Sequence, residues 1–263
     1  MSEKSLFSHI DDAGRATLTL NRPELHNAFD DALIAELTAA LRQLEADPAV
    51  RVVILAANGK SFSAGADLNW MRRMADYSDA ENLADSRALA ELMATLNHLS
   101  KPTIALVQGA AFGGGVGLVA CCDIAIATPR ASFCLSEVKL GLIPAVISPY
   151  VVAAIGERAC RRYFLSAERF DAAEALRLGL VHEIVEEEAL RGSAARFCTA
   201  LLENGPAALS AAKELIFHVA RQPLGAELQE TTARRIAGIR ASQEGREGLS
   251  AFLAKRKPYW IKG

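Results

Sequence analysis

The sequence predicts an α/β protein with a largely helical C-terminal part, and three observations support this fold class. Short apolar runs alternate with longer amphipathic segments over the first two thirds of the chain. The last third shows helical spacing almost throughout. Between the two parts lies a glycine-rich stretch, residues 103–144, which itself opens with an apolar run. Alternation of strands and helices is typical of folds in which helices cover a central sheet.

The strands are predicted from residue pattern and length. Arg15–Leu20 alternates polar and apolar residues, as a half-buried strand does, whereas 52–56 and Thr103–Val107 are apolar throughout, as buried strands are. Further strands are expected at 123–127, around Phe133 and at 181–185. Helical spacing predicts helices at 29–44, 81–99, 146–155, 158–165, 172–178, 187–202, 207–221, 224–241 and 244–255, besides a short buried helix after the glycines.

Composition excludes several classes of protein. The 263 residues include 29 Lys and Arg against 31 Asp and Glu, so the net charge of −2 gives no overall attraction to nucleic acid, although a local basic patch could hold phosphates. No run reaches membrane-spanning length and the N-terminus lacks the apolar core of a signal peptide, so we expect a cytoplasmic location. The five cysteines show no C-x-x-C spacing, which predicts free thiols and no metal site.

Two glycine-bearing segments predict a site for negative charge. Residues 63–66 follow one predicted strand, and Gly113–Gly115 follow another after a few residues. If these strands are neighbours, both segments leave the same edge of the sheet, and two backbone N–H groups can converge on one oxyanion. Tight turns with small residues for packing are the ordinary alternative. Glycine content alone leaves both interpretations open.

Glu137 is the candidate acid or base. It interrupts an apolar segment, and Lys139 is its nearest cation in the sequence. A salt-bridged loop glutamate is one explanation. The other is a carboxylate desolvated in a cleft, whose raised pKa would suit it to proton transfer. The residues alone favour neither.

Two motifs are misleading. The spacing of Gly115, Gly117 and Ala120 loosely fits the dinucleotide fingerprint, but its first glycine does not directly follow a strand and its helix ends early, so we do not expect nicotinamide binding. Ser136 and Lys139 match a serine-acylase tetrapeptide that lacks its companion motifs here.

The chain resembles the crotonase (enoyl-CoA hydratase/isomerase) superfamily over nearly its whole length. The resemblance rests on ordered motifs in 21–28, 61–68, 101–105, 113–115, 122–125, 140–144, 173–181 and 252–256, together with Glu137. It implies a spiral of ββα units in a core of residues 1–195. It also implies that a helical region, residues 196–263, builds a homotrimer or a dimer of trimers.

The resemblance also implies roles for individual residues. The N–H groups of Ala66 and Gly114 would hold the thioester oxygen of an acyl-CoA, and Glu137 matches the second of two catalytic glutamates of typical hydratases. Coenzyme A would enter as part of the substrate, with no resident cofactor. The residues implied in binding it are Glu24, Leu25, His26, Ala64, Ala66, Asp67, Leu68, Gly114 and Lys255, the last from this or a neighbouring subunit. The residues implied in the acyl pocket are Trp70, Met71, Gly117, Pro144 and Ala145.

Two departures from the family pattern bear on the substrate. Gly117 stands where typical hydratases have their first catalytic glutamate, and 145–150 replace a glycine-rich turn. This combination resembles a bacterial branch of methylglutaconyl-CoA hydratases of leucine and isovalerate breakdown. A sister branch hydrates isohexenylglutaconyl-CoA in acyclic terpene (citronellol and geraniol) breakdown. Such substrates carry an extra carboxylate, for which Gly117 is expected to leave room.

Two other functions are weighed against hydration. A Δ3-Δ2 enoyl-CoA isomerase is favoured only by the single glutamate. A non-catalytic or RNA-associated acyl-CoA-binding protein is disfavoured by the balanced charge and by the presence of both glycine-bearing segments and Glu137.

Overall fold

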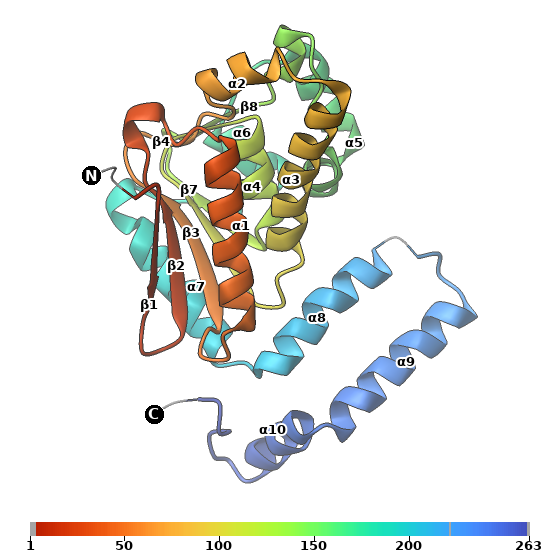
Figure 1. Ribbon diagram of the computed structural model, residues 1–263. Coiled ribbons are helices and arrows are strands. Elements are labelled where there is room, and N and C mark those ends of the chain that lie inside the picture. Colours follow the sequence, from red (N-terminus) through yellow and green to blue (C-terminus); the bar gives the residue numbers. More distant parts are fainter. Residues whose placement is uncertain (1–3, 221, 262–263) are drawn as a thin grey trace.

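A six-stranded sheet forms the centre of the computed structural model, which describes residues 4–220 and 222–261 (Figure 1). Only its first two strands pair in antiparallel fashion; the others are parallel. The strand order is β1 (Leu6–Ile10), β2 (Arg15–Leu20), β3 (Val52–Ala57), β5 (Thr103–Val107), β7 (Ile124–Ala127) and β10 (Glu183–Ile184).

A second, four-stranded sheet consists of β4 (Ser61–Ser63), β6 (Ala110–Phe112), β8 (Ser132–Cys134) and β9 (Phe170–Asp171). Three pairs of consecutive strands, β3–β4, β5–β6 and β7–β8, each contribute one strand to each sheet. The first strand of each pair belongs to the larger sheet and the second to the smaller one. Helices follow each pair along the chain. This repeat is the predicted spiral of ββα units, so the predicted fold class is confirmed.

Strand β5 joins two apolar clusters, and all five of its residues are buried. Side chains of a strand point alternately to opposite faces of the sheet. Ala105 and Val107 therefore belong to the main cluster on one face, while Ile104 and Leu106 belong to a smaller cluster on the other. The main cluster includes residues of α1 (Asp31–Ala46) and α3 (Asp79–Asn97), and the smaller one includes residues of α7 (Leu190–Leu202).

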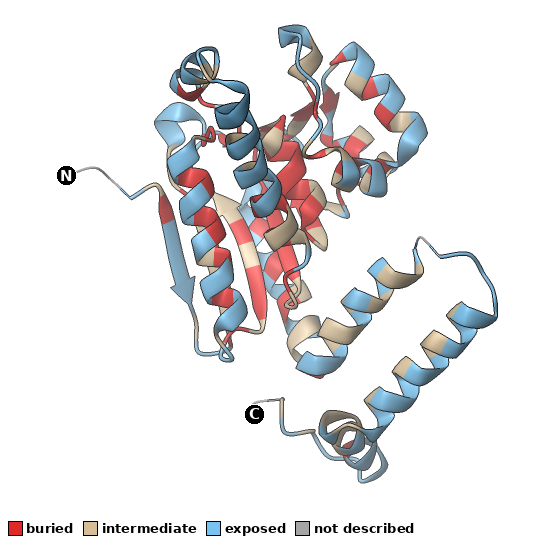
Figure 2. Ribbon diagram, turned by 45° about the vertical axis from the view of Figure 1, so that its right-hand side comes forward, coloured by how far each residue is buried: buried red, intermediate tan, exposed pale blue. Residues whose placement is uncertain are grey.

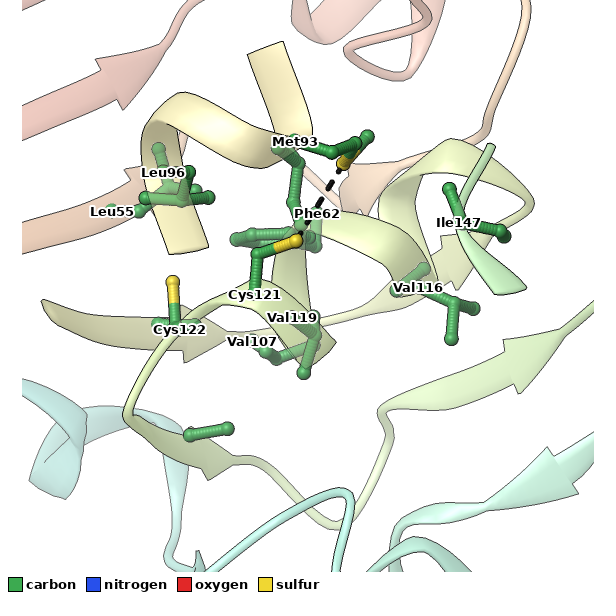
Figure 3. Packing of buried hydrophobic residues seen from close by; sticks show 14 of the residues in the cluster. Leu55, Phe62, Met93, Leu96, Val107, Val116, Val119, Cys121, Cys122 and Ile147 are labelled. Atoms are coloured by element: carbon green, nitrogen blue, oxygen red, sulfur yellow. Dashed lines mark hydrogen bonds between the residues drawn. The ribbon is translucent and has the colours of Figure 1, made fainter. Parts of the chain in front are cut away.

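Helix α4 (Gly114–Cys121) lies in the main cluster, and residues 115–119 are buried. At its C-terminal end the Cys121 Sγ approaches the Met93 Sδ of α3 at 3.9 Å (Figure 3). The next helix, α5 (Ser148–Ser166), corresponds to two helices predicted at 146–155 and 158–165. Two helices are observed within this range, as predicted: the backbone is not helical at Gly156, whose φ of 79° is a left-handed value that favours glycine. Helix α6 (Ala172–Leu178) follows.

The C-terminal helices α8 (Pro206–Val219), α9 (Ala226–Ala241) and α10 (Gln243–Leu253) project from the core as an arm (Figure 1). Neither α8 nor α9 contains a buried residue, and both are coloured as exposed or intermediate in Figure 2. Large apolar side chains of this arm face solvent in the single chain: Ile216, Ile236, Leu249, Phe252 and Leu253. Large exposed apolar side chains gathered on one part of a chain are typical of an interface. The trimeric assembly stays a prediction.

All five cysteines are free, as predicted, and the structure shows that all five are also buried. Burial raises the pKa of Cys122 to about 12 and the pKa values of Cys160 and Cys198 to about 11, because the apolar interior disfavours the thiolate. Over residues 4–220 and 222–261, no helix is both long and apolar enough to cross a membrane.

The sequence prediction missed four strands, β1, β4, β6 and β9, and the seven-residue helix α2 (Leu68–Met74). β4, β6 and β9 have two or three residues each, which are too few to show alternation, and α2 lies in a polar stretch for which no element was predicted. The helix predicted at 207–221 is observed as Pro206–Val219, and its predicted last residue, Arg221, lies outside the described residues.

Candidate active site

The two glycine-bearing segments meet at one edge of the smaller sheet. They follow β4 and β6, which are parallel neighbours with Ser63 opposite Ala111. The backbones then pack closely, since a Cβ placed on Gly113 would lie 4.0 Å from the Gly65 Cα, and one placed on Gly65 would lie 3.2 Å from the Phe112 carbonyl oxygen. Both glycines have left-handed φ values, 91° and 49°. The predicted convergence of the two segments is thus observed.

This packing leaves two N–H groups free. The N–H of Asp67 donates to the Phe29 carbonyl and that of Gly113 to the Cys134 carbonyl. In contrast, the N–H groups of Ala66 and Gly114 have no hydrogen-bond acceptor among the described residues. Gly114 is the first residue of α4, where unpaired N–H groups carry the positive end of the helix dipole. Two free donors at one sheet edge suit an oxyanion.

Glu137 faces this edge. It begins the short 3-10 helix η2 (Glu137–Leu140) after β8, and a Cβ on Gly113 would lie 3.2 Å from its Oε1. Its Oε2 is buried and has no hydrogen-bond partner in the described chain. Burial raises the pKa of this carboxyl, while a hydrogen bond from its own backbone N–H opposes the shift.

The other interpretation of Glu137, a loop salt bridge to Lys139, is wrong for this structure. Lys139 is exposed, and the ion pairs of the described residues do not include Glu137. Desolvation without a neighbouring cation is the environment expected of a carboxylate that accepts and returns a proton.

Charged residues hold the 64–68 segment in place. Arg22 pairs with Asp30 at 2.7 Å and lies 3.8 Å from Asp67. Asp67 is buried and caps α2, because its Oδ1 accepts hydrogen bonds from the N–H groups of Asn69 and Trp70. Ala66 also pairs with Phe29 in an isolated parallel β-bridge, so its N–H is held between this bridge and the capped helix α2.

The 22–28 and 61–68 segments form one unit. Residues Pro23–Leu25 form a 3-10 turn, after which His26 and Asn27 both have a left-handed φ of 53°. The Ala64 N–H donates to the His26 carbonyl at 3.0 Å. Of the residues expected to hold coenzyme A, Glu24, Leu25, His26, Ala66 and Leu68 are exposed, Ala64 and Gly114 are half-buried and Asp67 is buried. The exposed ones lie together and are available to a ligand.

Lys255 lies elsewhere. It follows α10, which Figure 1 shows at the opposite end of the molecule from α2 and β4. Within one chain it is therefore distant from the other residues expected to bind coenzyme A. Of the two alternatives drawn from the resemblance, only a lysine contributed by a neighbouring subunit remains as a proposal.

The residues expected to line the acyl pocket come from three elements. Trp70 and Met71 lie on α2, and the buried Trp70 donates its indole N–H to Asp85 of α3 at 3.0 Å. Pro144, which is buried, and Ala145, which is exposed, lie between η2 and α5. Gly117 is buried in α4, one helical turn beyond Gly113.

The structure corrects the expectation that Gly117 leaves room. A Cβ at this position would lie 2.3 Å from the Cγ2 of Ile147, 3.0 Å from its Cβ and 3.2 Å from the Cε of Met93. Ile147 fills the space. The sequence analysis did not include Ile147 in the pocket, although the unusual 145–150 segment was a signal. The two departures from the family pattern are therefore in contact.

Two surface clefts lie away from these residues. One, of about 340 Å³, is lined by parts of β2, α7 and the C-terminal segment, including Arg15, Arg51 and Trp260. The other, of about 700 Å³, is lined by α5 and α6. Glu137 lines neither cleft. Within the described residues there is no cluster of three or more His, Cys, Asp or Glu able to hold a metal.

Comparison with known proteins agrees with this fold. The family model described as enoyl-CoA hydratase/isomerase matches residues 11–263. A solved enoyl-CoA hydratase from Shewanella pealeana is 50% identical, with a TM-score of 0.95 over 98% of this chain and 96% of that one. The 2,3-dehydroadipyl-CoA hydratase of Escherichia coli is 35% identical over 92% of each chain. The 1,2-epoxyphenylacetyl-CoA isomerase of the same organism is 35% identical over 96% of this chain and 97% of its own.

The chain is thus an enzyme in which two free backbone N–H groups and a desolvated carboxylate lie at one edge of the smaller sheet. It belongs to the enoyl-CoA hydratase/isomerase (crotonase) family. The enoyl-CoA hydratases of this family are hydro-lyases.

Proposed function

We propose that this enzyme adds water to a 3-substituted glutaconyl-CoA, of the 3-methylglutaconyl-CoA type, with Glu137 as its single acid–base residue. The observation that carries the proposal is the buried carboxylate of Glu137: its Oε2 has no hydrogen-bond partner among the described residues, and its Oε1 lies against Gly113, the residue before the free N–H of Gly114. An apolar side chain, Ile147, occupies the place beside Gly117 where a second carboxylate would lie.

The proposed reaction uses each of these groups once. The N–H groups of Ala66 and Gly114 bind the thioester oxygen and stabilise the enolate that forms when C3 is attacked. Glu137 takes a proton from the attacking water, so that hydroxide adds to C3, and then returns a proton to C2. Water is thereby added across the double bond with no change in oxidation state. One donor of an oxyanion site is typically worth about 10²–10³ in rate.

The substrate class follows from charge. A glutaconyl-CoA carries its own carboxylate, and a second glutamate beside it would add like-charge repulsion in a desolvated site. The apolar wall of Ile147 and Met93 suits the alkyl substituent on C3 and does not suit the carboxylate. Leucine and isovalerate breakdown, or terpene breakdown for a longer substituent, would supply such substrates.

The second candidate is a Δ3-Δ2 enoyl-CoA isomerase. A single carboxylate suffices to move a proton between two carbons, and Glu137 is such a group. The isomerase relative described above shows a different reaction on a similar chain. Isomerisation without hydration is the result that would favour this candidate.

The deciding experiment compares kcat/KM on crotonyl-CoA, 3-methylglutaconyl-CoA and isohexenylglutaconyl-CoA for hydration, and on a 3-enoyl-CoA for isomerisation. We expect a large preference for one of the two glutaconyl substrates. The Glu137→Gln variant should lose about 10²–10⁴ in rate. Glu188→Gln, an exposed glutamate of another 3-10 helix, is the matched control and should retain full activity. Near-normal hydration by Glu137→Gln, or a preference for crotonyl-CoA, would refute the proposal.

A further inference from the structure

Glu137 and Ile147 lie against two glycines at the start of α4. The Gly117 N–H donates to the Gly113 carbonyl at 3.2 Å, so the two glycines are one helical turn apart. The Oε1 of Glu137 lies over Gly113, and the Cγ2 of Ile147 lies over Gly117. Glu137 therefore lies against the residue that precedes α4, and Ile147 lies against the helix one turn further along the chain.

Ile147 is held firmly in this position. It is only 3% exposed, and Figure 3 shows it beside Val116 within the packed cluster. As a β-branched residue it has few χ1 rotamers. Its close approach to Gly117 involves both its Cβ and its Cγ2, neither of which can swing aside as the end of a long side chain could.

The wall behind Ile147 is more adaptable. Met93 Cε lies 3.2 Å from the place of a Gly117 Cβ, and the Met93 Sδ contacts the Cys121 Sγ. Methionine is unbranched and fills irregular space readily. A shorter side chain at position 147 would therefore open a space bounded by Met93, whose side chain can adopt another conformation.

We propose that Ile147 is a specificity-determining residue, which sets the size of the C3 substituent that fits beside Glu137. This inference rests on the proposed function for the identity of the substrate. Its test does not, because it also uses substrates other than glutaconyl-CoA. The rigid isoleucine admits a short substituent such as methyl and excludes a long alkenyl chain.

The test measures kcat/KM of Ile147→Ala and Ile147→Val on two pairs of substrates. One pair is 3-methylglutaconyl-CoA and isohexenylglutaconyl-CoA; the other is crotonyl-CoA and 2-hexenoyl-CoA. We expect the ratio of long to short substrate to rise at least tenfold in Ile147→Ala and by less in Ile147→Val, because contacts of about one methylene in an apolar pocket change selectivity 10–200-fold. Val152→Ala, on the exposed side of the same helix, should leave both ratios unchanged.

The outcomes separate this inference from the proposed function. If the wild-type enzyme hydrates only crotonyl-CoA, the proposed substrate is wrong, and the second pair still tests Ile147. If either pair is turned over and Ile147→Ala lowers both members alike, Ile147 is only a packing residue and the inference fails. Should Ile147→Ala not fold, as judged by circular dichroism, the ratio in Ile147→Val decides, and an unchanged ratio there overturns the inference.

Discussion

Lys213 of α8 and Asp123, which precedes β7, form an ion pair of 2.8 Å that joins the C-terminal arm to the core. The lysine side chain is only 11% exposed, and the same Asp123 oxygen also accepts hydrogen bonds from the N–H and the hydroxyl of Thr103. A pair that is largely removed from water is screened little by salt. It therefore fixes the start of the arm against the edge of the larger sheet.

Replacing Lys213 by methionine should lower the free energy of unfolding by about 1.5–3 kcal/mol, since it removes a charged hydrogen bond from a half-buried carboxylate. The measurement is the urea midpoint at a fixed protein concentration. Lys257→Met, which removes an exposed ammonium with no ion pair among the described residues, is the control. Equal midpoints for the two variants would show that the pair contributes no stability.

The contact between Gly117 and Ile147 predicts a coupled pair of substitutions. Gly117→Ala gains about 1 kcal/mol in helix propensity, but its Cβ meets the Ile147 Cγ2 at 2.3 Å, and overpacking typically costs about 1–3 kcal/mol. We expect net destabilisation in the wild-type background. With Ile147→Ala present the 2.3 Å contact to Cγ2 is gone, and only the approaches of 3.0 Å to the Cβ of residue 147 and 3.2 Å to the Met93 Cε remain, so Gly117→Ala should cost less than it does in the wild-type background. A double-mutant cycle measured by urea denaturation tests this; additive effects would contradict it.

The raised pKa of Glu137 predicts the pH dependence of activity. The mechanism needs the ionised carboxylate, so kcat/KM should fall on the acid side, with its midpoint above the ordinary glutamate value of 4.5. The shift arises from burial. A pH–rate profile of wild type gives the midpoint. A midpoint at or below 4.5 would mean that Glu137 is not the group that titrates.

The same carboxylate should reduce stability at neutral pH. A raised folded-state pKa means that the folded chain binds more protons than the unfolded chain between the ordinary value and the raised one, so stability falls as pH rises through that window. Glu137→Gln should therefore be more stable than wild type above the raised pKa, by about 1 kcal/mol or more if the unpartnered charge is as costly as is usual. The difference should vanish below pH 4. Thermal melts across pH provide the measurement, and equal melting temperatures at pH 8 would count against it.

Asn27 should control coenzyme A binding without joining the chemistry. It is fully buried; its Oδ1 accepts from the Arg22 N–H, and its Nδ2 donates to the carbonyls of Asn58 and Ser61. Asn27→Ala removes these bonds and places alanine at a φ of 53°, a combined cost of about 3 kcal/mol. We expect KM for the acyl-CoA to rise about tenfold while kcat changes little.

The matched variants for that experiment separate backbone strain from hydrogen bonding. Asn27→Gly relieves the strain but makes no side-chain bonds, and Asn27→Asp retains an acceptor for the Arg22 N–H. If Asn27→Gly binds substrate as wild type does, the side-chain bonds are not what positions the segment.

Much of the core could be predicted because its signals are local. Strand β5 and helix α6 have the bounds expected of them, since an apolar run or a helical period is visible within one segment. The strands β4 and β6 were missed, although they position both oxyanion donors. With three residues each, they are defined by pairing with distant partners and have no pattern of their own.

The site divides in the same way. Glu137 and the glycine-bearing segments were predicted because each is conspicuous in its own stretch of sequence. Gly117 was equally conspicuous, because a glycine stands where the family pattern has a glutamate. The residue that fills the space beside it could not be predicted, because Ile147 is thirty residues further along and reaches Gly117 only through the packing of α5 on α4. Lys139 is the opposite case: it is close to Glu137 in the sequence but forms no ion pair with it.

The burial of all five cysteines has a practical consequence. With no thiol at the surface and with pKa values shifted upward, the folded chain offers thiol-directed reagents and oxidants very little thiolate to attack. The sulfurs become reactive only when the interior opens. The rate at which a mild alkylating reagent labels the native protein therefore measures how often its core opens. Mass spectrometry can follow this labelling at each cysteine, and no probe has to be introduced.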